Sequence, residues 1–497
     1  MMIDTLKRGL LIGIYLVGGA PLIALSGGAQ QDLIIINNVT VINVRNGVKT
    51  AADILISGDK IIGLEPNGNL TGKDNLHLKN AQIVDATGQY AIPGLWDMHV
   101  HLTKNIELRS KISSLFVANG VTSVRDLGAE VDDILSFIDN STTLGNMAPQ
   151  IWAAGPMLDG TPPVFDGKPD VSGPGKIDPA MSMQVETPAD GIALVDKLAE
   201  HGFKLIKPYE TLRPDVFSAI AKRANKHGLL VDGHIPMRMT ILEAMEAGIN
   251  GVQHLKGVPA GCSINPQNLK EERIKILDKA AKDARGVDLF VEVFTTVVPK
   301  ALAQQDPVRC NKLIEAFVDM GIWHTPTLST ERFFFMSENE RSVWEDSLKY
   351  LPESFRIEVE SSLEKIKSLP TIKVIKNKYK WKREMVDKMH RAGVNFLAGT
   401  DTPALLIPGF SLHDELAALV EQGGLSPLAS LQAATLNPAK FFNIEDSQGS
   451  IEVGMVADIL LLDANPLLDI NNTRQLNTVI LRGKILDRSA LNLLLSK

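Results

Sequence analysis

The sequence passes from an apolar stretch to a pair of histidines in the segment Pro93-Gly94-Leu95-Trp96-Asp97-Met98-His99-Val100-His101. In a strand, residues i and i+2 point to the same side, so a strand that ends here directs the imidazoles of His99 and His101 toward one point. Two such imidazoles can bind one metal ion. The pair alone is a weak signal, because a polar surface strand produces the same pattern.

Seven more short apolar runs follow this segment, and most of them also end in polar residues. Amphipathic helical patterns, such as those at 215–227 and 240–247, separate the runs. Eight strand–helix units in series predict an α/β fold, a (β/α)8 TIM barrel. Two long connections, 256–320 and 328–392, are expected to carry extra helices that help to build a substrate pocket. The eight runs are Ile92–His101, Val121–Asp126, Ile151–Gly155, Phe203–Lys207, Leu229–His234, Ile249–His254, Ile322–Thr327 and Val394–Asp401.

Both ends of the chain are rich in short predicted strands, unlike the middle. Residues 31–92 alternate apolar runs such as Leu33–Ile36 with turn signals such as Asn46-Gly47, and a similar pattern returns at 454–484. We therefore expect the N- and C-terminal segments to form one small β-sandwich domain beside the barrel. The predicted boundaries are 30–92 for the first part of the β-sandwich, 93–425 for the barrel, and 426–497 for the last barrel helix with the second part of the β-sandwich.

The first 29 residues differ from the rest of the chain. Lys7 and Arg8 precede an apolar run from Gly9 to Leu25, and small residues up to Ala29 follow it. These are the parts of a secretory signal peptide. We expect cleavage after Ala29 and a mature protein that is exported to the periplasm or secreted. A retained membrane anchor is the alternative, although the run is at the short end for a bilayer span.

Composition narrows the partners of the protein. The net charge is −7 over 497 residues, and no cluster of basic residues provides a surface for nucleic acid. We expect a small-molecule substrate, no nucleic acid, and no membrane span once the signal peptide is removed. The sequence leaves open whether the protein forms a homo-oligomer. The two cysteines, Cys262 and Cys310, are too few for a disulfide framework and are interpreted as packing residues, with a single bridge left open.

Four more residues with metal-binding or catalytic chemistry end predicted strands. They are Lys207, His234, His254 and Asp401. Barrel enzymes keep their catalytic groups at the C-terminal ends of the strands, which meet at one mouth. Each histidine by itself is more typical of the protein core. The set of six residues, with His99 and His101, predicts instead a metal site at that mouth.

These motifs resemble those of the amidohydrolase superfamily, especially its imidazolonepropionase-like proteins and metal-dependent Xaa-Pro or Xaa-Arg dipeptidases. The resemblance covers nearly the whole mature chain. Besides the segment that ends in His99 and His101, it rests on Gly399-Thr400-Asp401-Thr402-Pro403, on Ser411–Leu416, on Ala433–Ala439 and on Gly449–Asp458.

The resemblance implies a role for each of the six residues. His99 and His101 would bind the more buried metal together with Asp401, and His234 and His254 would bind the second metal. Lys207 matches the lysine that is carboxylated in binuclear members, where its carbamate bridges two divalent metal ions. The metal stays open between zinc and manganese, and imidazole and carboxylate ligands in an open site suit Zn²⁺. Asp401 is also the predicted catalytic general base and acid.

Four further residues are candidates for substrate binding, each with a structural alternative. Tyr209 lies two residues beyond Lys207 and faces the same way if the strand continues. His324 ends the seventh strand, and His413 follows the eighth near a helix start. Arg125 ends the second strand, where a buried ion pair with a neighbour is as typical as a clamp on a substrate carboxylate.

The leading functional interpretation is hydrolysis of an amide C–N bond by metal-activated water, in a dipeptide, an N-acyl amino acid or a cyclic amide. The alternative is a lactone, ester or phosphotriester substrate on the same binuclear site. Ile235 and Pro236 follow His234, where dipeptidase-like members are expected to have an aromatic residue, and this departure weakens a specific dipeptide assignment. A noncatalytic metal-binding protein would not need Asp401 or Lys207.

Overall fold

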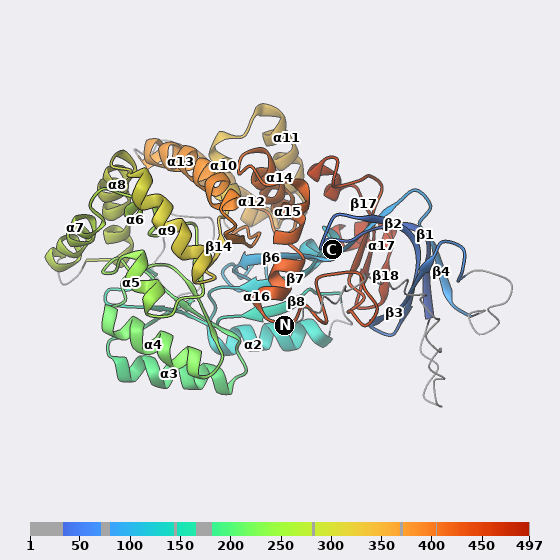
Figure 1. The fold of residues 1–497 in the computed structure, drawn as a ribbon, viewed down its shortest axis with the longest axis horizontal. Helices are drawn as coiled ribbons and strands as arrows, with labels where there is room; N and C mark the ends of the chain where they lie inside the picture. Colours follow the sequence, from blue (N-terminus) through green and yellow to red (C-terminus); the bar gives the residue numbers. More distant parts are fainter. Residues whose placement is uncertain are drawn as a thin grey trace, which may run out of the picture.

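The computed structural model describes residues 33–70, 80–143, 147–165, 181–280, 284–367, 371–403 and 405–496. The predicted signal peptide, residues 1–29, lies outside these ranges. Figure 1 shows an α/β barrel beside a smaller β-sheet domain that contains both the first and the last strands of the described chain. Among the described residues, no helix combines the length and apolar character needed to cross a membrane.

The β-sheet domain is one mixed sheet of strands from both ends of the chain. Its order is β18-β17-β16-β5-β1-β2-β3, and β4 pairs with β1. Alternating apolar residues give the sheet a buried face, where Ile36, Ile54, Ile459 and Ile480 pack together. The strands are β1 (Leu33–Ile42), β2 (Lys49–Ser57), β3 (Lys60–Pro66), β4 (Gln82–Asp85), β5 (Tyr90–Pro93), β16 (Ile459–Leu462), β17 (Leu476–Leu481) and β18 (Lys484–Leu486).

The central sheet is a closed barrel of parallel strands, and the predicted fold class is confirmed. Closure occurs where Met98 N donates to Ala398 O at 2.9 Å and Asp401 N donates to His99 O at 2.7 Å. β8 pairs with β7 and β9 pairs with β11, so these two segments, three residues apart, together form the third of eight barrel strands. The barrel strands are β6 (Leu95–Val100), β7 (Val121–Asp126), β8 (Gln150–Ala153) with β9 (Met157–Asp159), β11 (Leu205–Pro208), β12 (Leu230–Gly233), β13 (Gly251–Gln253), β14 (Trp323–Thr325) and β15 (Asn395–Phe396), and β10 (Ser182–Gln184) pairs with β9.

Helices surround the barrel, and their local sequences explain where they begin. Pro214 starts one helix in the first turn, where a missing N–H costs nothing. Thr240 caps the next by accepting a hydrogen bond from Glu243 N. Helices outside the two long connections are α1 (Ile112–Ala118), α2 (Val131–Thr143), α3 (Pro188–Glu200), α4 (Pro214–Lys226), α5 (Ile241–Glu246), α14 (Phe410–Glu421), α15 (Pro427–Ala433), α16 (Leu436–Phe441) and α17 (Arg488–Ser496).

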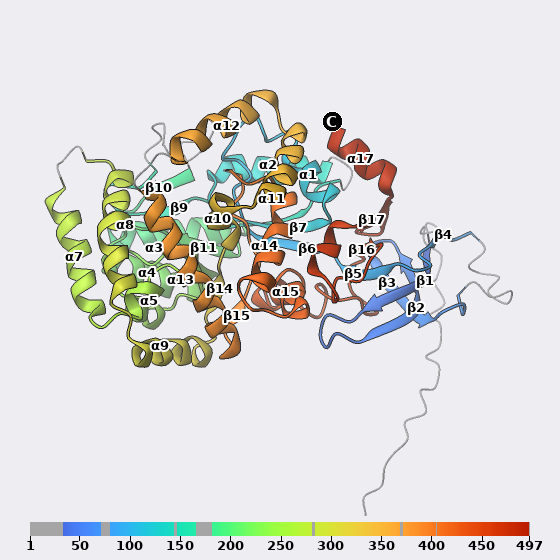
Figure 2. The ribbon, with the colours of Figure 1, turned by 90° about the horizontal axis from the view of Figure 1, so that it is seen from above.

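The two long connections carry additional helices over one end of the barrel, as Figure 2 shows. The helix α8 of the first connection packs against α13 of the second. The first connection contains α6 (Val258–Gly261), α7 (Pro266–Lys279), α8 (Gly286–Ala303) and α9 (Pro307–Asp319). The second contains α10 (Leu328–Arg332), α11 (Glu338–Ser347), α12 (Glu353–Lys367) and α13 (Thr371–Arg391).

A disulfide joins Cys262, at the end of α6, to Cys310 in α9. The single bridge that the sequence left open is therefore formed. Both sulfur atoms are buried in the first long connection, and 48 residues separate them in the sequence. Sequence spacing alone does not show that α9 folds back onto α6.

Candidate metal centre

Three of the predicted ligands meet at the point where the first and last barrel strands adjoin. Asp401 Oδ1 lies 3.3 Å from His99 Nε2 and 3.2 Å from His101 Nε2. Four ligands around one Zn²⁺, at the usual bond length of about 2.1 Å, would stand about 3.4 Å apart. Both distances fit donors that share one divalent ion, and the donor atoms of all three residues lie within 4.8 Å of one another.

The other three predicted ligands line the same cavity, which has a volume of about 290 Å³. The ring of His254 lies 4.8 Å from that of His99 and 5.1 Å from that of His234, centre to centre. Lys207 is almost fully buried at the cavity wall. The structure thus brings all six predicted metal-binding residues to one cavity.

Backbone geometry helps to direct two of these side chains. His254 has φ = 56° and Asp401 has φ = 65°, so both adopt the left-handed conformation, His254 directly after β13 and Asp401 five residues after β15. Residues other than glycine seldom adopt this conformation, and such positions concentrate at functional sites. The turn points each side chain into the barrel mouth, where His254 Nε2 lies 3.7 Å from Asp401 Oδ2.

Hydrogen bonds behind the histidines fix the orientation of three rings. The Nδ1 atom lies 2.7 Å from Gln253 Oε1 in His99, 2.8 Å from Glu210 Oε1 in His234, and 2.6 Å from Thr327 Oγ1 in His254. Partners of this kind hold the tautomer whose Nε2 lone pair is available to a metal. His101 Nδ1 has no such partner within the described part of the chain.

Burial keeps three of the candidate histidine ligands, His99, His234 and His254, neutral. It is the main cause that lowers the pKa of His99 and of His254 well below the usual range, and it lowers the pKa of His234 to about 3. Neutral imidazole is the form that binds metals. Burial by itself would raise the pKa of Asp401, but the larger opposing effect of His99, His101 and Lys104 brings the pKa below its usual value. Asp401 is therefore a carboxylate.

Lys207 lies in surroundings that favour an uncharged amine. Burial lowers the pKa of its ammonium group to about 8, against the opposing effects of Asp232 and Asp401. An amine with a lower pKa is more often in the neutral form, which is the form that can react with carbon dioxide. The location is therefore compatible with carboxylation of Lys207, which converts a cation into an anionic oxygen donor.

A polar layer lies beneath the cavity, inside the barrel. Arg125 is fully buried there, with Nη1 2.5 Å from Asp232 Oδ2 and Nε 2.7 Å from Met98 O. Asp232 also accepts a hydrogen bond from Gln253, which holds His99. Residue 251 is glycine, and a Cβ there would overlap the Asp232 carboxylate. Arg125 thus forms the buried ion pair, the first of its two predicted alternatives, and is not among the residues that line the cavity.

The structure separates the other three substrate candidates. Tyr209 lines the cavity and stacks on His234 with ring centres 4.3 Å apart. His324 is fully buried and packs on Phe317 of α9, because its neighbour Thr325 occupies the inward side of the strand. His413 hydrogen-bonds Thr473 Oγ1 and Asn119 O. Neither His324 nor His413 lines the cavity, so both have a structural role and do not face the substrate space.

Sequence reasoning missed several residues that support the ligands. Asp232 lies two residues before His234, so strand alternation already places it on the same side, below the ligand. Gln253 immediately precedes His254, and Glu210 lies three residues beyond Lys207. No local pattern distinguishes these two from other polar residues, because their roles depend on contacts between different strands.

Comparisons with known proteins agree with this arrangement. A model of the amidohydrolase family matches residues 350–486. Ochratoxinase of Aspergillus niger is 24% identical over 446 residues, which cover 84% of this chain and 78% of the relative. The structure of that ochratoxinase superposes with a TM-score of 0.58 and 18% identity, covering 92% of this chain and 96% of the other.

A Xaa-Pro dipeptidase crystallised with methionine in its active site gives a TM-score of 0.63 and 19% identity, covering 92% of this chain and all of the other. Residues 350–486 thus match the amidohydrolase family, most of the chain is similar in sequence to ochratoxinase, and its fold is that of the Xaa-Pro dipeptidase.

Proposed function

We propose that the protein hydrolyses the amide bond of a small substrate such as a dipeptide, an N-acyl amino acid or a cyclic amide. The observation that carries this proposal is the convergence of His99, His101, His234, His254, Lys207 and Asp401 on one cavity. The Xaa-Pro dipeptidase, by its name, cleaves dipeptides, which are substrates of this kind. The departure at Ile235 and Pro236 keeps the proposal at the level of a substrate class.

Two divalent metal ions, preferably Zn²⁺, suit the donor set. His99, His101 and Asp401 would hold one ion, His234 and His254 the other, and a carboxylated Lys207 would bridge them. Bound ions of this type lower the pKa of a water molecule and polarise the substrate carbonyl. The neutral, oriented imidazoles described above are the form that such binding requires.

Asp401 is the proposed proton carrier of the reaction. Its carboxylate is ionised and faces the cavity, so it can accept a proton from the attacking water. The same group can then donate the proton to the leaving nitrogen, which departs as an amine. Tyr209 stands on the cavity wall beside His234 and is proposed to contact the substrate.

A side-by-side hydrolysis screen tests this function. The protein would be stripped of metal, reloaded with Zn²⁺ or Mn²⁺, and given N-acyl amino acids, dipeptides, cyclic amides, lactones, esters and phosphotriesters. We expect metal-dependent release of an amine from at least one amide class, and none from the Asp401→Asn control. Turnover confined to lactones, esters or phosphotriesters would replace the amide proposal with the alternative.

We also propose that the mature protein works outside the cytoplasm. The N-terminal pattern of residues 1–29 supports export, and the Cys262–Cys310 disulfide is of a kind that persists in oxidising compartments.

A further inference from the structure

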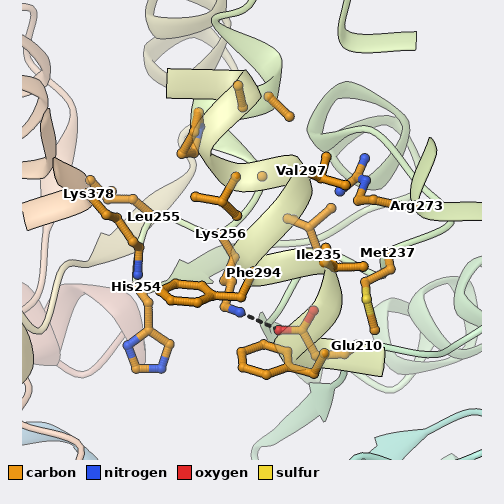
Figure 3. Close-up of a pocket in the computed structure, with 17 residues that line it drawn as sticks. Glu210, Ile235, Met237, His254, Leu255, Lys256, Arg273, Phe294, Val297 and Lys378 are labelled. Carbon is orange, nitrogen blue, oxygen red and sulfur yellow. Dashed lines mark ion pairs between the residues drawn. The ribbon is translucent and has the colours of Figure 1, made fainter. Parts of the chain in front are cut away.

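The lining of the metal cavity contains four charged side chains besides the six predicted ligands. Three of them belong to ion pairs that are complete without a substrate. Lys256 Nζ lies 2.6 Å from Glu210 Oε1, a pair that Figure 3 also shows. Glu331 lies 2.8 Å from Lys378 Nζ and 2.7 Å from Lys382 Nζ. The four charged side chains of the lining are Lys104, Lys256, Lys378 and Glu331.

Lys104 is the exception among these four. It lies three residues after His101, is half-buried, and lines the cavity. Among the described residues, none forms a hydrogen bond or an ion pair with its side chain. Burial by itself would raise the pKa of Asp401, but Lys104 is one of the groups whose charge lowers it, so its ammonium group lies within electrostatic range of that carboxylate. Lys104 is therefore a cation near the proposed proton carrier that is still available to an anion.

The chemistry of an amino-acid amide brings its carboxylate to the same place. The carboxylate is attached to the carbon atom that also bears the leaving nitrogen. Asp401 is proposed to donate a proton to that nitrogen, so the carboxylate of a bound substrate must also lie near Asp401. Lys104 can pair with it there, through a hydrogen bond in which both partners are charged, and such bonds are among the stronger ones in proteins.

The other half of the substrate meets a lining that has no carboxylate to spare. Among the described residues that line the cavity, the carboxylates are Asp401 and Glu331. Asp401 faces His99 and His101, and Glu331 is paired with two lysines. The N-terminal ammonium group of a dipeptide would lose its hydration here without gaining a counter-ion, which is costly.

An uncharged acyl group avoids this cost, because it can cover the apolar part of the lining. Phe165 lies beside Tyr209, with ring centres 5.8 Å apart, and Tyr209 stacks on the metal-ligand candidate His234. An apolar surface therefore begins directly at the metal centre. The apolar side chains that line the cavity are Met157, Phe165, Met181, Phe290 and Phe294.

We propose that the substrate is an N-acyl amino acid with a free carboxylate and an uncharged acyl group, and that Lys104 binds the carboxylate. The inference rests on the proposed function and deepens it, because it selects one of the three substrate classes named there. Lys104 is then a specificity residue, which contacts the leaving half of the substrate and holds no metal.

Binding of analogues that cannot be cleaved tests the assignment without relying on turnover. The probes are three ketones in which CH₂ replaces the amide N–H. The first is the analogue of N-acetyl-L-leucine, and the second has a hydrogen atom in place of its carboxylate. The third is the analogue of glycyl-L-leucine, which adds an ammonium group at the acyl end. Calorimetry with the Zn²⁺-loaded protein measures each dissociation constant.

Loss of a hydrogen bond between charged groups typically weakens binding about 10- to 100-fold. Lys104 is partly exposed to solvent, which places the expected effect at the lower end of that range. We therefore expect the first ketone to bind about 10-fold more tightly than the second. It should also bind more tightly than the third, whose ammonium group finds no counter-ion.

Three variants sharpen the test. Lys104→Met removes the charge but keeps a side chain of similar length, and it should bind the first two ketones equally. Lys104→Arg should keep the preference for the carboxylate, because guanidinium also pairs with it. Lys111→Met is the matched control, since Lys111 is also partly exposed but donates to Tyr350 O and does not line the cavity. It should bind like the wild type, and elemental analysis should find the same metal content in all three variants.

Equal binding of the first two ketones to the wild type, no binding of the first, or equal or tighter binding of the third would overturn the assignment. An unchanged preference in Lys104→Met would overturn the role of Lys104. Failure of the proposed function is a different result. In that case the amide screen is negative while the preference for the carboxylate and its dependence on Lys104 can still be observed.

Discussion

At the scale of single residues, Asp401 has contacts that suit two roles. Its Oδ1 is shared between His99 and His101, and its Oδ2 faces His254. A carboxylate in this position can hold a metal and still exchange a proton with substrate. β15 ends at Phe396, and the chain then turns so that residue 401 faces back into the mouth. The left-handed backbone conformation of Asp401 is part of this turn.

Asp401→Asn should lower kcat about 100- to 10,000-fold while leaving the fold intact, because the amide matches the carboxylate in shape but cannot accept the proton. Steady-state kinetics on the substrate found by the screen measures kcat, and circular dichroism checks the fold. A kcat close to that of the wild type would exclude Asp401 as the proton carrier.

Lys207→Ala should lose one or both metals together with activity, because alanine cannot supply the anionic carbamate that is proposed to bridge the two metal ions. Added short carboxylic acids such as acetate should partly restore both. Lys207→Arg is the matched variant and should not recover, because guanidinium cannot form a carbamate. Two bound metals and a normal rate in Lys207→Ala would exclude the bridge in favour of a mononuclear site.

At the scale of elements, the helices of the long connections are anchored by a buried ionic cluster. Glu331 of α10 lies 2.8 Å from Lys378 Nζ and 2.7 Å from Lys382 Nζ, both on α13. Burial by itself would raise the pKa of Glu331, but the larger opposing effect of the two ammonium groups lowers the pKa to about 2. Because this value is below the usual 4.5, the stabilisation is complete above about pH 4.5 and is lost as the pH falls toward 2.

Glu331→Gln should lower the free energy of unfolding by about 3–5 kcal/mol at neutral pH, because Lys382 is fully buried and would lose its carboxylate partner. Urea denaturation measures the change. Glu345→Gln, at an exposed position of α11, is the control and should have little effect. Equal stability of the two variants would show that the cluster does not anchor α10 to α13.

The elements also show how far sequence reasoning extends. Strand alternation and the rule that barrel catalysts lie at strand ends place His99, His101, Lys207, His234, His254 and Asp401 in one mouth. The same rule fails for His324, where the inward position belongs to the adjacent Thr325. The part of the cavity wall formed by Phe290 and Phe294 could not be predicted, because it depends on how α8 packs over the barrel. No local periodicity encodes that packing.

At the scale of the whole molecule, the first and last strands form one sheet that braces the barrel. β16 pairs with β5 immediately before the strand that carries His99 and His101. The β-sheet domain therefore continues directly into the metal centre, although its own residues do not line the cavity. The paired ends were predictable because both show the same short-strand pattern, whereas the order of strands within the sheet was not.

Export is the prediction that belongs to this scale. The native protein should be recovered outside the cytoplasm with an N-terminus near Gln30, since residues 1–29 have the parts of a cleavable signal. N-terminal sequencing of the purified native protein measures this. An N-terminus at Met1 or Met2 would contradict cleavage.

The central claim is that one barrel mouth holds a binuclear hydrolytic site. Elemental analysis of the protein, stripped of metal and reloaded with Zn²⁺, tests it most directly. We predict two equivalents of metal per chain, with hydrolysis rising in step with metal content. One equivalent or none at saturation, in protein that remains folded, would contradict the binuclear site.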